Sequence, residues 1–111
     1  MYGSWQLMEF CYGADCSNVT DHDIVQIWQF NEDVVNCDES KTIHLGRQFQ
    51  EGIMDNEILW FFSKNNDTLF TSNKMGEDAD TFLVQRLDKD TMLLSSLMNN
   101  ILVQQLFVKT E

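Results

Sequence analysis

The chain has 111 residues, and its 18 acidic against 7 basic side chains give a formal net charge of −11. Such a charge repels phosphate backbones and anionic lipid surfaces, so we predict no nucleic-acid partner. The apolar runs fall far short of the roughly 20 residues that a spanning helix needs, so we predict no transmembrane segment. A chain of this length can bury roughly two-thirds of its unfolded surface, and we predict one domain over residues 1–111.

Short apolar and aromatic runs recur along the chain, and clusters of Asn, Asp, Ser or Gly close them. The runs cover Ser4–Tyr12, Ile24–Phe30, Ile43–Phe49, Ile58–Ser63, Thr68–Ser72, Thr81–Leu87, Thr91–Ser96 and Ile101–Lys109. Evenly spaced short strands with turn residues between them are typical of an all-β sandwich or barrel. The chain has no proline, a residue that often blunts exposed sheet edges, and this favours a closed barrel that has no such edges.

Polar turns link these runs in chain order. Asn31-Glu32-Asp33 is predicted to form a hairpin turn into Val34–Cys37, and Asn65-Asn66 a two-residue hairpin. Asn99-Asn100 is predicted to form the last turn. Because each connection is short, we predict an antiparallel up-and-down meander that closes into a barrel of about eight strands.

The hairpin register at Asn65-Asn66 places Phe62 opposite Leu69 and Trp60 opposite Thr71. Alternation along the strands then predicts these inward residues, which are also our candidate ligand-binding residues: Trp5, Leu7, Trp28, Phe30, Trp60, Phe62, Leu69, Phe82, Val84, Met92 and Leu94. An eight-stranded barrel is either filled by such side chains or holds one small ligand, and both readings stay open. A bound ligand would be small and apolar, with Arg47 or Arg86 as charges at the mouth.

Three cysteines, Cys11, Cys16 and Cys37, leave at least one sulfur unpaired. Cys16 and Cys37 flank a segment that could bring them together, whereas Cys11 lies within an apolar run and is predicted to be a small buried residue. No sequence argument fixes a disulfide pairing. His22 and His44 lack zinc-ligand spacing, so we predict no metal site and no cofactor.

We also predict that the protein is not an enzyme. Acid–base catalysis needs carboxylates or histidines held in a cleft, whereas the acids here crowd turns that water solvates. Ser95-Ser96 has no histidine near it in the sequence, and the scattered glycines form no phosphate-binding loop.

Several segments together suggest a family: Gly3-Ser4-Trp5-Gln6-Leu7, Ile27–Asp33, Phe62 with Asp67-Thr68-Leu69, Phe82–Leu94 and Leu106–Lys109. They resemble the small bacterial lipocalin-like domains that are common among exported lipoproteins of gut bacteria of the Bacteroides type. Members of that family begin with a G-x-W-x-L strand and end with hairpins of the form Leu, polar turn, Leu-x-Leu. Val34 stands where the family usually has a hairpin glycine, and the resemblance covers most of the chain in order.

The resemblance implies a lipocalin-like barrel that binds a small hydrophobic ligand and is exported to the periplasm or outer membrane, with a lipid anchor on its precursor. The chain enters its first strand at once, and a cytoplasmic location stays open. The net charge supports an alternative function, an acidic protein-interaction or inhibitor module that binds a cationic protein.

Overall fold

The structure is a computed structural model, and it describes residues 2–19, 24–37, 42–63, 65 and 67–110. Within these ranges the chain forms β-strands and no α-helix, and accordingly no helix that could cross a membrane. The strands are β1 (Gly3–Tyr12), β2 (Asp15–Asn18), β3 (Gln26–Cys37), β4 (Thr42–Gln50), β5 (Met54–Phe62), β6 (Thr68–Asn73), β7 (Asp80–Leu87), β8 (Thr91–Met98) and β9 (Ile101–Lys109). The predicted all-β class is confirmed.

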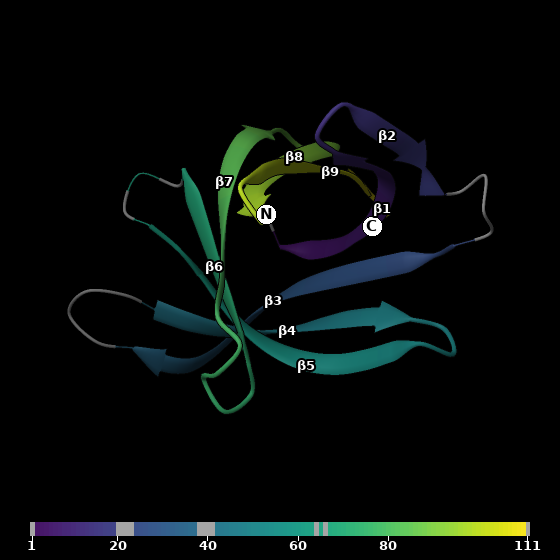
Figure 1. The fold of residues 1–111 in the computed structure, drawn as a ribbon. Coiled ribbons are helices and arrows are strands. Elements are labelled where there is room, and N and C mark those ends of the chain that lie inside the picture. Colours follow the sequence, from purple (N-terminus) through teal and green to yellow (C-terminus); the bar gives the residue numbers. More distant parts are fainter. Residues whose placement is uncertain (1, 20–23, 38–41, 64, 66, 111) are drawn as a thin grey trace.

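The strands form one antiparallel sheet in the order β2-β1-β3-β4-β5-β6-β7-β8-β9, and β1 pairs in addition with β9. That last pairing closes β1 and β3–β9 into an eight-stranded barrel, with β2 lying outside the closure against the end of β1 (Figure 1). The predicted meander and its closure are therefore confirmed. β2 was not predicted, because its four side chains are all exposed and carry no apolar alternation.

The predicted hairpin turn at Asn31-Glu32-Asp33 is wrong. β3 continues through these residues, and its pairing with β4 shifts between Phe30 and Val34. The three polar residues on β3 stand opposite a single residue of β4, so they form a bulge that exposes them to solvent. Asn, Glu and Asp side chains are compatible with a bulge as well as with a turn. β4 extends far enough to pair with β3 on the far side of the bulge. The connection from β3 to β4 lies among residues 38–41, outside the described residues.

The Asn99-Asn100 turn between β8 and β9 is confirmed. Both residues have positive φ, 53° and 65°, as a two-residue turn of the mirror-image type requires. Asn tolerates this left-handed conformation better than most side chains do. The predicted register of β5 and β6 is also confirmed, with Trp60 opposite Thr71 and Phe62 opposite Leu69, although residues 64 and 66 of that hairpin are not described.

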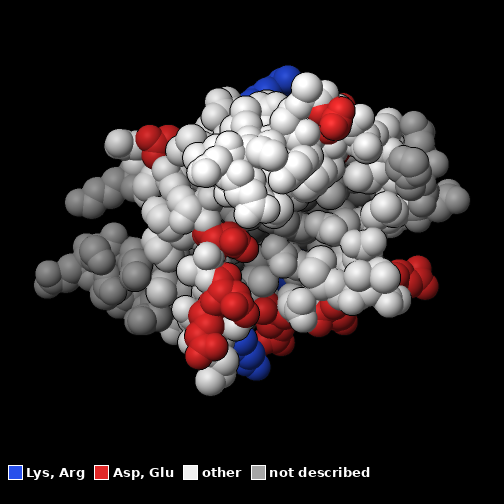
Figure 2. Space-filling view, viewed as in Figure 1, with Lys and Arg blue, Asp and Glu red and all other residues white. Residues whose placement is uncertain are grey.

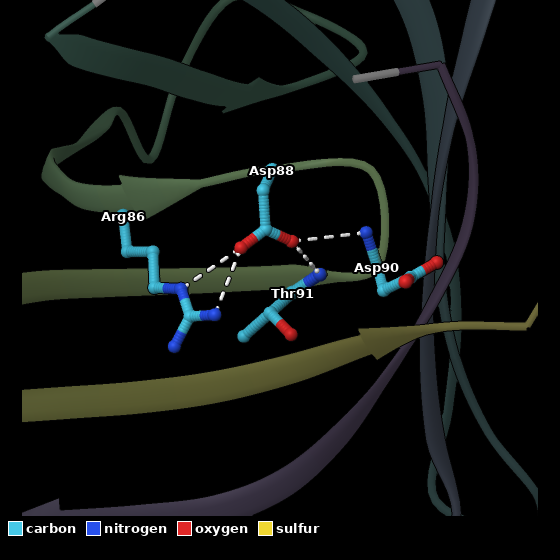
Figure 3. A network of polar contacts seen from close by, with 4 residues as sticks. All are labelled: Arg86, Asp88, Asp90 and Thr91. Atoms are coloured by element: carbon cyan, nitrogen blue, oxygen red, sulfur yellow. Dashed lines mark hydrogen bonds and ion pairs between the residues drawn. The ribbon is translucent and has the colours of Figure 1, made fainter.

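A carboxylate organises the hairpin between β7 and β8 (Figure 3). One oxygen of Asp88 accepts hydrogen bonds from the backbone N–H groups of Asp90 at 3.0 Å and Thr91 at 2.8 Å, and the other accepts one from Arg86 at 2.9 Å. These donors stabilise the ionised carboxylate and lower the pKa of Asp88, the Asp90 N–H most of all. The side chain therefore fixes the turn as a negatively charged group.

The barrel interior holds a dense aromatic and aliphatic core. All eleven predicted inward residues belong to it: nine are buried, and Phe62 and Val84 are partly buried and pack against them. Phe107, which was not predicted, lies at the centre, with its ring centroid 4.8 Å from that of Trp28. Val19, from the segment after β2, joins the same cluster.

The cysteine pairing left open by the sequence is a disulfide between Cys11 and Cys16. These residues stand directly opposite each other on β1 and β2, and the turn between them uses Gly13 at a φ of 63°. A pairing of Cys16 with Cys37 is thereby ruled out in this state. Cys11 is buried, as predicted.

Candidate ligand-binding cavity

The barrel interior changes character along its strands. At one end, which we call the packed half, the inward side chains are large, apolar and fully buried: Phe30, Met92, Leu94 and Phe107. Two residues further along the same strands, the inward positions become polar, with Ser96 following Leu94 on β8 and Gln105 preceding Phe107 on β9. A serine is too small to fill the space of a leucine, and a glutamine amide needs hydrogen-bond partners that an apolar core does not offer.

The opposite end, which we call the open half, is lined by inward residues that include Phe10, Gln48, Ser96 and Gln105. The wall of the barrel is interrupted at this end because the first residues of β7 have a partner strand on one side only. The first residues of β7 pair with β6, whereas pairing with β8 starts only at Leu83 opposite Ser95. The start of β7 and the end of β8 are therefore not hydrogen-bonded to each other, and the interior is accessible there.

A cavity of about 720 Å³ occupies the open half. This volume lies within the range of roughly 300–1,000 Å³ typical of small-molecule sites. Aromatic rings from three strands line it, those of Phe10, Trp28 and Phe82, and the last two meet edge to face with centroids 5.6 Å apart. The full lining is Phe10, Trp28, Gln48, Ala79, Asp80, Thr81, Phe82, Leu83, Ser95, Ser96, Leu97, Met98, Leu102, Val103 and Gln105.

A chain of amides holds the Trp28 ring at this cavity. The indole Nε1–H donates to the side-chain oxygen of Gln26 at 2.8 Å, and the Gln26 amide donates to Gln50 at 3.0 Å. The indole therefore buries its apolar surface while its polar edge is hydrogen-bonded. A ring fixed in this way forms a rigid wall for a ligand.

The tip of the β8–β9 hairpin stands at the cavity and is apolar. Leu97, Met98, Ile101 and Leu102 are all exposed there, and Leu97 is 73% exposed. Three of the four also line the cavity. Exposed apolar side chains gathered at one place often mark a binding surface, and here they surround the entrance to an apolar cavity.

A second, more polar cavity of about 580 Å³ adjoins the first and shares Gln48 and Asp80 with it. Its other lining residues are Asp55, Asn56, Glu57, Ile58, Thr71, Ser72, Asn73, Lys74, Met75 and Asp78. Figure 2 shows acidic side chains gathered over the lower part of the molecule, where the β6–β7 loop projects in Figure 1, whereas the upper part is largely uncharged. The two adjoining cavities, both open to solvent, thus pass from an apolar to an acidic lining.

The acidic side chains of the second cavity differ in whether a cationic side chain is paired with them. Arg47 donates to both carboxylate oxygens of Asp55 at 2.7 and 2.8 Å, which lowers the pKa of Asp55 chiefly through these hydrogen bonds. Lys74 lies 3.3 Å from Glu57. Within the described part of the chain no ion pair involves Asp80, which stands opposite Thr71 on the inward face. Asp78 also has no ion pair among the described residues and accepts a hydrogen bond from the Asn73 amide at 3.2 Å, so Asp78 and Asp80 are the carboxylates of this cavity without a cationic partner there.

All eleven predicted site residues belong to the core or pack against it. Two of them, Trp28 and Phe82, also line the 720 Å³ cavity. As ligand-binding residues all eleven stay a prediction. Neither Arg47 nor Arg86 lines the cavity, and each is paired with an aspartate, so the charged side chain at its edge is Asp80.

Several residues of the site were missed, and the sequence holds a signal for some of them. Val103, Gln105 and Phe107 alternate along β9, and the register sets Gln105 opposite Leu94. A glutamine within an inward alternation is therefore a marker of a cavity, since it replaces a core side chain. Phe10 has no such signal, because the pairing of β1 with β9 shifts between Leu7 and Glu9 and changes which side chains point inward.

No protein-family model matches this chain, and neither does any curated protein or solved structure. The family resemblance drawn from its strand and turn motifs accordingly stays a prediction. The antiparallel barrel is established by the structure alone, and the role of its cavity has to be inferred from the residues that line it.

Proposed function

We propose that this protein binds an amphiphilic small molecule with an apolar body and a neutral or cationic polar end. The observation that carries the proposal is the junction of the two cavities, which share Gln48 and Asp80. An apolar body fits beside Trp28 and Phe82, where its burial is favourable by roughly 25 cal/mol per Å². The polar end then lies toward the acidic second cavity.

The charge of the site selects among amphiphiles. Among the described residues that line the apolar cavity, Asp80 alone is charged, and Asp55, Glu57 and Asp78 lie beyond it. A carboxylate headgroup, as in a fatty acid, would meet repulsion from Asp80, whereas an ammonium group would be attracted. The Gln48 and Gln105 amides supply hydrogen bonds that suit a neutral hydroxyl or amide headgroup.

The direct test is displacement of a neutral apolar dye, N-phenyl-1-naphthylamine, whose fluorescence rises in an apolar site. Dodecylammonium, dodecanol and dodecanoate share one chain length and differ in headgroup charge. We expect them to compete in that order when each is kept below its micelle concentration. No dye response, or strongest competition by dodecanoate, would contradict the proposal.

A pair of variants on one strand locates the dye. Ser96→Phe places a ring into the cavity and should abolish the dye response. Thr91→Phe adds the same ring to β8 on the outward face, opposite Val108, and should leave the response unchanged. Equal binding by both variants would place the dye on the outer surface instead.

A second candidate function uses the same acidic cavity. The net charge of −11 and the carboxylates around Asp80 suit the insertion of a Lys or Arg side chain from a cationic protein. This binding would weaken steeply with ionic strength, while dye displacement by dodecanol would not. A capture experiment with basic proteins at low and high salt separates the two functions.

Export as a lipoprotein belongs to the proposal only through the family resemblance. A precursor that carries an export signal ending in a lipidated cysteine would support both the location and the family. Radiolabelled palmitate incorporated into the full-length precursor, expressed in its own host, is the measurement that tests it.

A further inference from the structure

Three potential metal ligands meet on the outer face of the β1–β2 hairpin. Cys11 and Cys16 stand directly opposite each other across the two strands. Glu9 lies on the same face of β1, with a carboxylate oxygen 3.3 Å from the Cys11 sulfur. One ligand atom from each of the three residues lies within 4.8 Å of the others. In the structure the two sulfurs form a disulfide, which has no proton to donate to that carboxylate.

The surroundings leave room for a further ligand. A hollow of about 230 Å³ adjoins the cluster and is lined by Glu9, Cys11, Leu93, Gln104 and Leu106. Gln104 faces Cys11 across β1 and β9, so its amide oxygen or a water molecule can complete a coordination shell. Cys16 is exposed, which gives an ion a path from solvent.

We propose that the reduced β1–β2 hairpin binds a thiophilic divalent cation, Zn²⁺ above all, through Cys11, Cys16 and Glu9. Zn–S bonds of about 2.3 Å and Zn–O bonds of about 2.1 Å in a tetrahedron set the two sulfurs about 3.8 Å apart and each sulfur about 3.6 Å from the oxygen. Opposed β-strand residues have Cβ atoms about 4.5–5.5 Å apart, close enough for small side-chain rotations to reach these distances. Zinc sites with three protein ligands are known, and a water molecule takes the fourth position in them.

The disulfide and the metal exclude each other. A dithiol reductant transfers two electrons and two protons to the Cys11–Cys16 disulfide and is itself oxidised to a disulfide. The cation then displaces the two thiol protons and binds the resulting thiolates. A disulfide oxidant such as oxidised glutathione takes two electrons from the thiolates and, with two protons from solvent, becomes two thiols, while the Cys11–Cys16 bond forms again and the ion is released. The redox state of the compartment therefore decides which form the hairpin takes.

Cobalt(II) is the spectroscopic probe, since a tetrahedral thiolate site gives intense visible bands and a near-ultraviolet charge-transfer band. The reduced protein should show both bands, saturate at one equivalent and lose them when Zn²⁺ is added. The oxidised protein should show neither. Reduced protein that stays folded by circular dichroism and yet shows no bands would overturn the proposal.

Variants assign the ligands. Cys11→Ser and Cys16→Ser should each abolish the bands, and Glu9→Gln should weaken binding by about tenfold or more. Cys37→Ser is the matched thiol control, and Glu32→Gln, at an exposed residue of β3 that lines neither large cavity, is the matched carboxylate control. Both should bind cobalt as the wild type does. Loss of the bands in Cys37→Ser with retention in Cys11→Ser would overturn the assignment.

A second measurement does not depend on the variants folding. The reduced wild-type protein is alkylated with and without Zn²⁺, and the modified cysteines are identified by peptide mass spectrometry. Zn²⁺ should protect Cys11 and Cys16 by tenfold or more and leave the rate at Cys37 unchanged. Equal rates with and without Zn²⁺ at all three cysteines would overturn the proposal.

Discussion

The packed half and the open half of this barrel are built by the same strands and differ only in the size and polarity of inward side chains. Along β8, Met92 and Leu94 are fully buried, and Ser96, the next inward residue, borders a cavity of about 720 Å³. Along β9, Phe107 fills the core and Gln105 does not. One set of strands therefore forms a densely packed core in one half and a cavity in the other.

The largest expected effect is the difference between two Phe→Ala substitutions, one in each half. Phe107→Ala should lower the free energy of unfolding by about 3–5 kcal/mol, because Phe107 is fully buried and its removal leaves a cavity in dense packing. Phe10 already borders open space, so Phe10→Ala should cost less than about half as much and should weaken dye binding. Urea unfolding followed by tryptophan fluorescence measures both. Equal losses would show that the two halves are packed alike.

Substitutions that enlarge a side chain should also distinguish the packed half from the open half, with a smaller effect on the free energy of unfolding. A Cβ atom at Gly46 on β4 would lie 2.6 Å from the carbonyl oxygen of Gln29 and 3.1 Å from atoms of Ile58 and Trp60. Gly46→Ala should therefore cost about 1–3 kcal/mol, since the clash involves backbone that cannot rotate away.

The matching addition in the open half is Ser96→Phe. It adds far more volume than one methyl group, yet it should change stability by less than about 0.5 kcal/mol because its ring enters existing space. Thermal unfolding of the two variants side by side is the measurement. A Ser96→Phe protein that is less stable than Gly46→Ala would mean that the cavity is not available to a side chain.

The packed half was predictable from the sequence, whereas in the open half only the apolar residues Trp28 and Phe82 were predicted and the polar residues were not. Apolar alternation at period two identified Met92 and Leu94 as inward residues, because burial of large side chains leaves a strong pattern. Gln105 can be placed on the inward face because Val103 and Phe107 occupy the alternate positions on either side of it. Gln48 has Gly46 and Gln50 at those positions, so only the pairing register shows which side of the sheet it occupies.

The same reasoning explains the errors in local structure. Asn31-Glu32-Asp33 has the composition of a turn, but whether such residues reverse the chain or bulge out of a strand depends on how far the partner strand extends. The Cys11–Cys16 disulfide likewise depends on β2, a strand whose exposed side chains have no period. Both features are set by tertiary pairing, which local propensity does not encode.

A third prediction concerns the charge at the junction of the two cavities. Asp80→Asn should weaken the competition by dodecylammonium about fivefold and strengthen that by dodecanoate about fivefold, which corresponds to about 1 kcal/mol for two charges close together in a solvated site. Competition by dodecanol should not change. The readout is the dye-displacement curve for each competitor at low ionic strength.

Asp67→Asn is the matched control for that charge. Asp67 is exposed beside the β5–β6 hairpin, where Ser63 and Thr68 donate hydrogen bonds to it, and it does not line either cavity. The substitution removes the same unit of net charge and should leave all three competitors unchanged. If both variants shift the competitors equally, the headgroup senses the net charge of the molecule and not Asp80.

The smallest expected effect is on the melting temperature, and it concerns the turns at the two ends of β8. Because the pKa of Asp88 is lowered in the folded protein, its contribution to stability is complete above the ordinary aspartate pKa of about 3.9. It is lost as the pH falls through the lowered pKa, where the folded-state carboxylate takes up its proton. Asp88→Asn should therefore lower the melting temperature slightly at neutral pH and not at all in strong acid.

The turn at the other end of β8 has no titrating group and supplies the comparison. Asn99→Gly should shift the melting temperature by the same amount at every pH, since glycine adopts the positive φ of Asn99 without a charge change. Melting curves of the wild type and both variants from acid to neutral pH separate these behaviours. The difference in melting temperature between Asp88→Asn and the wild type can close in acid only if Asp88 binds its proton differently in the folded and unfolded states. If that difference is the same at every pH, Asp88 fixes its turn by shape and not by charge.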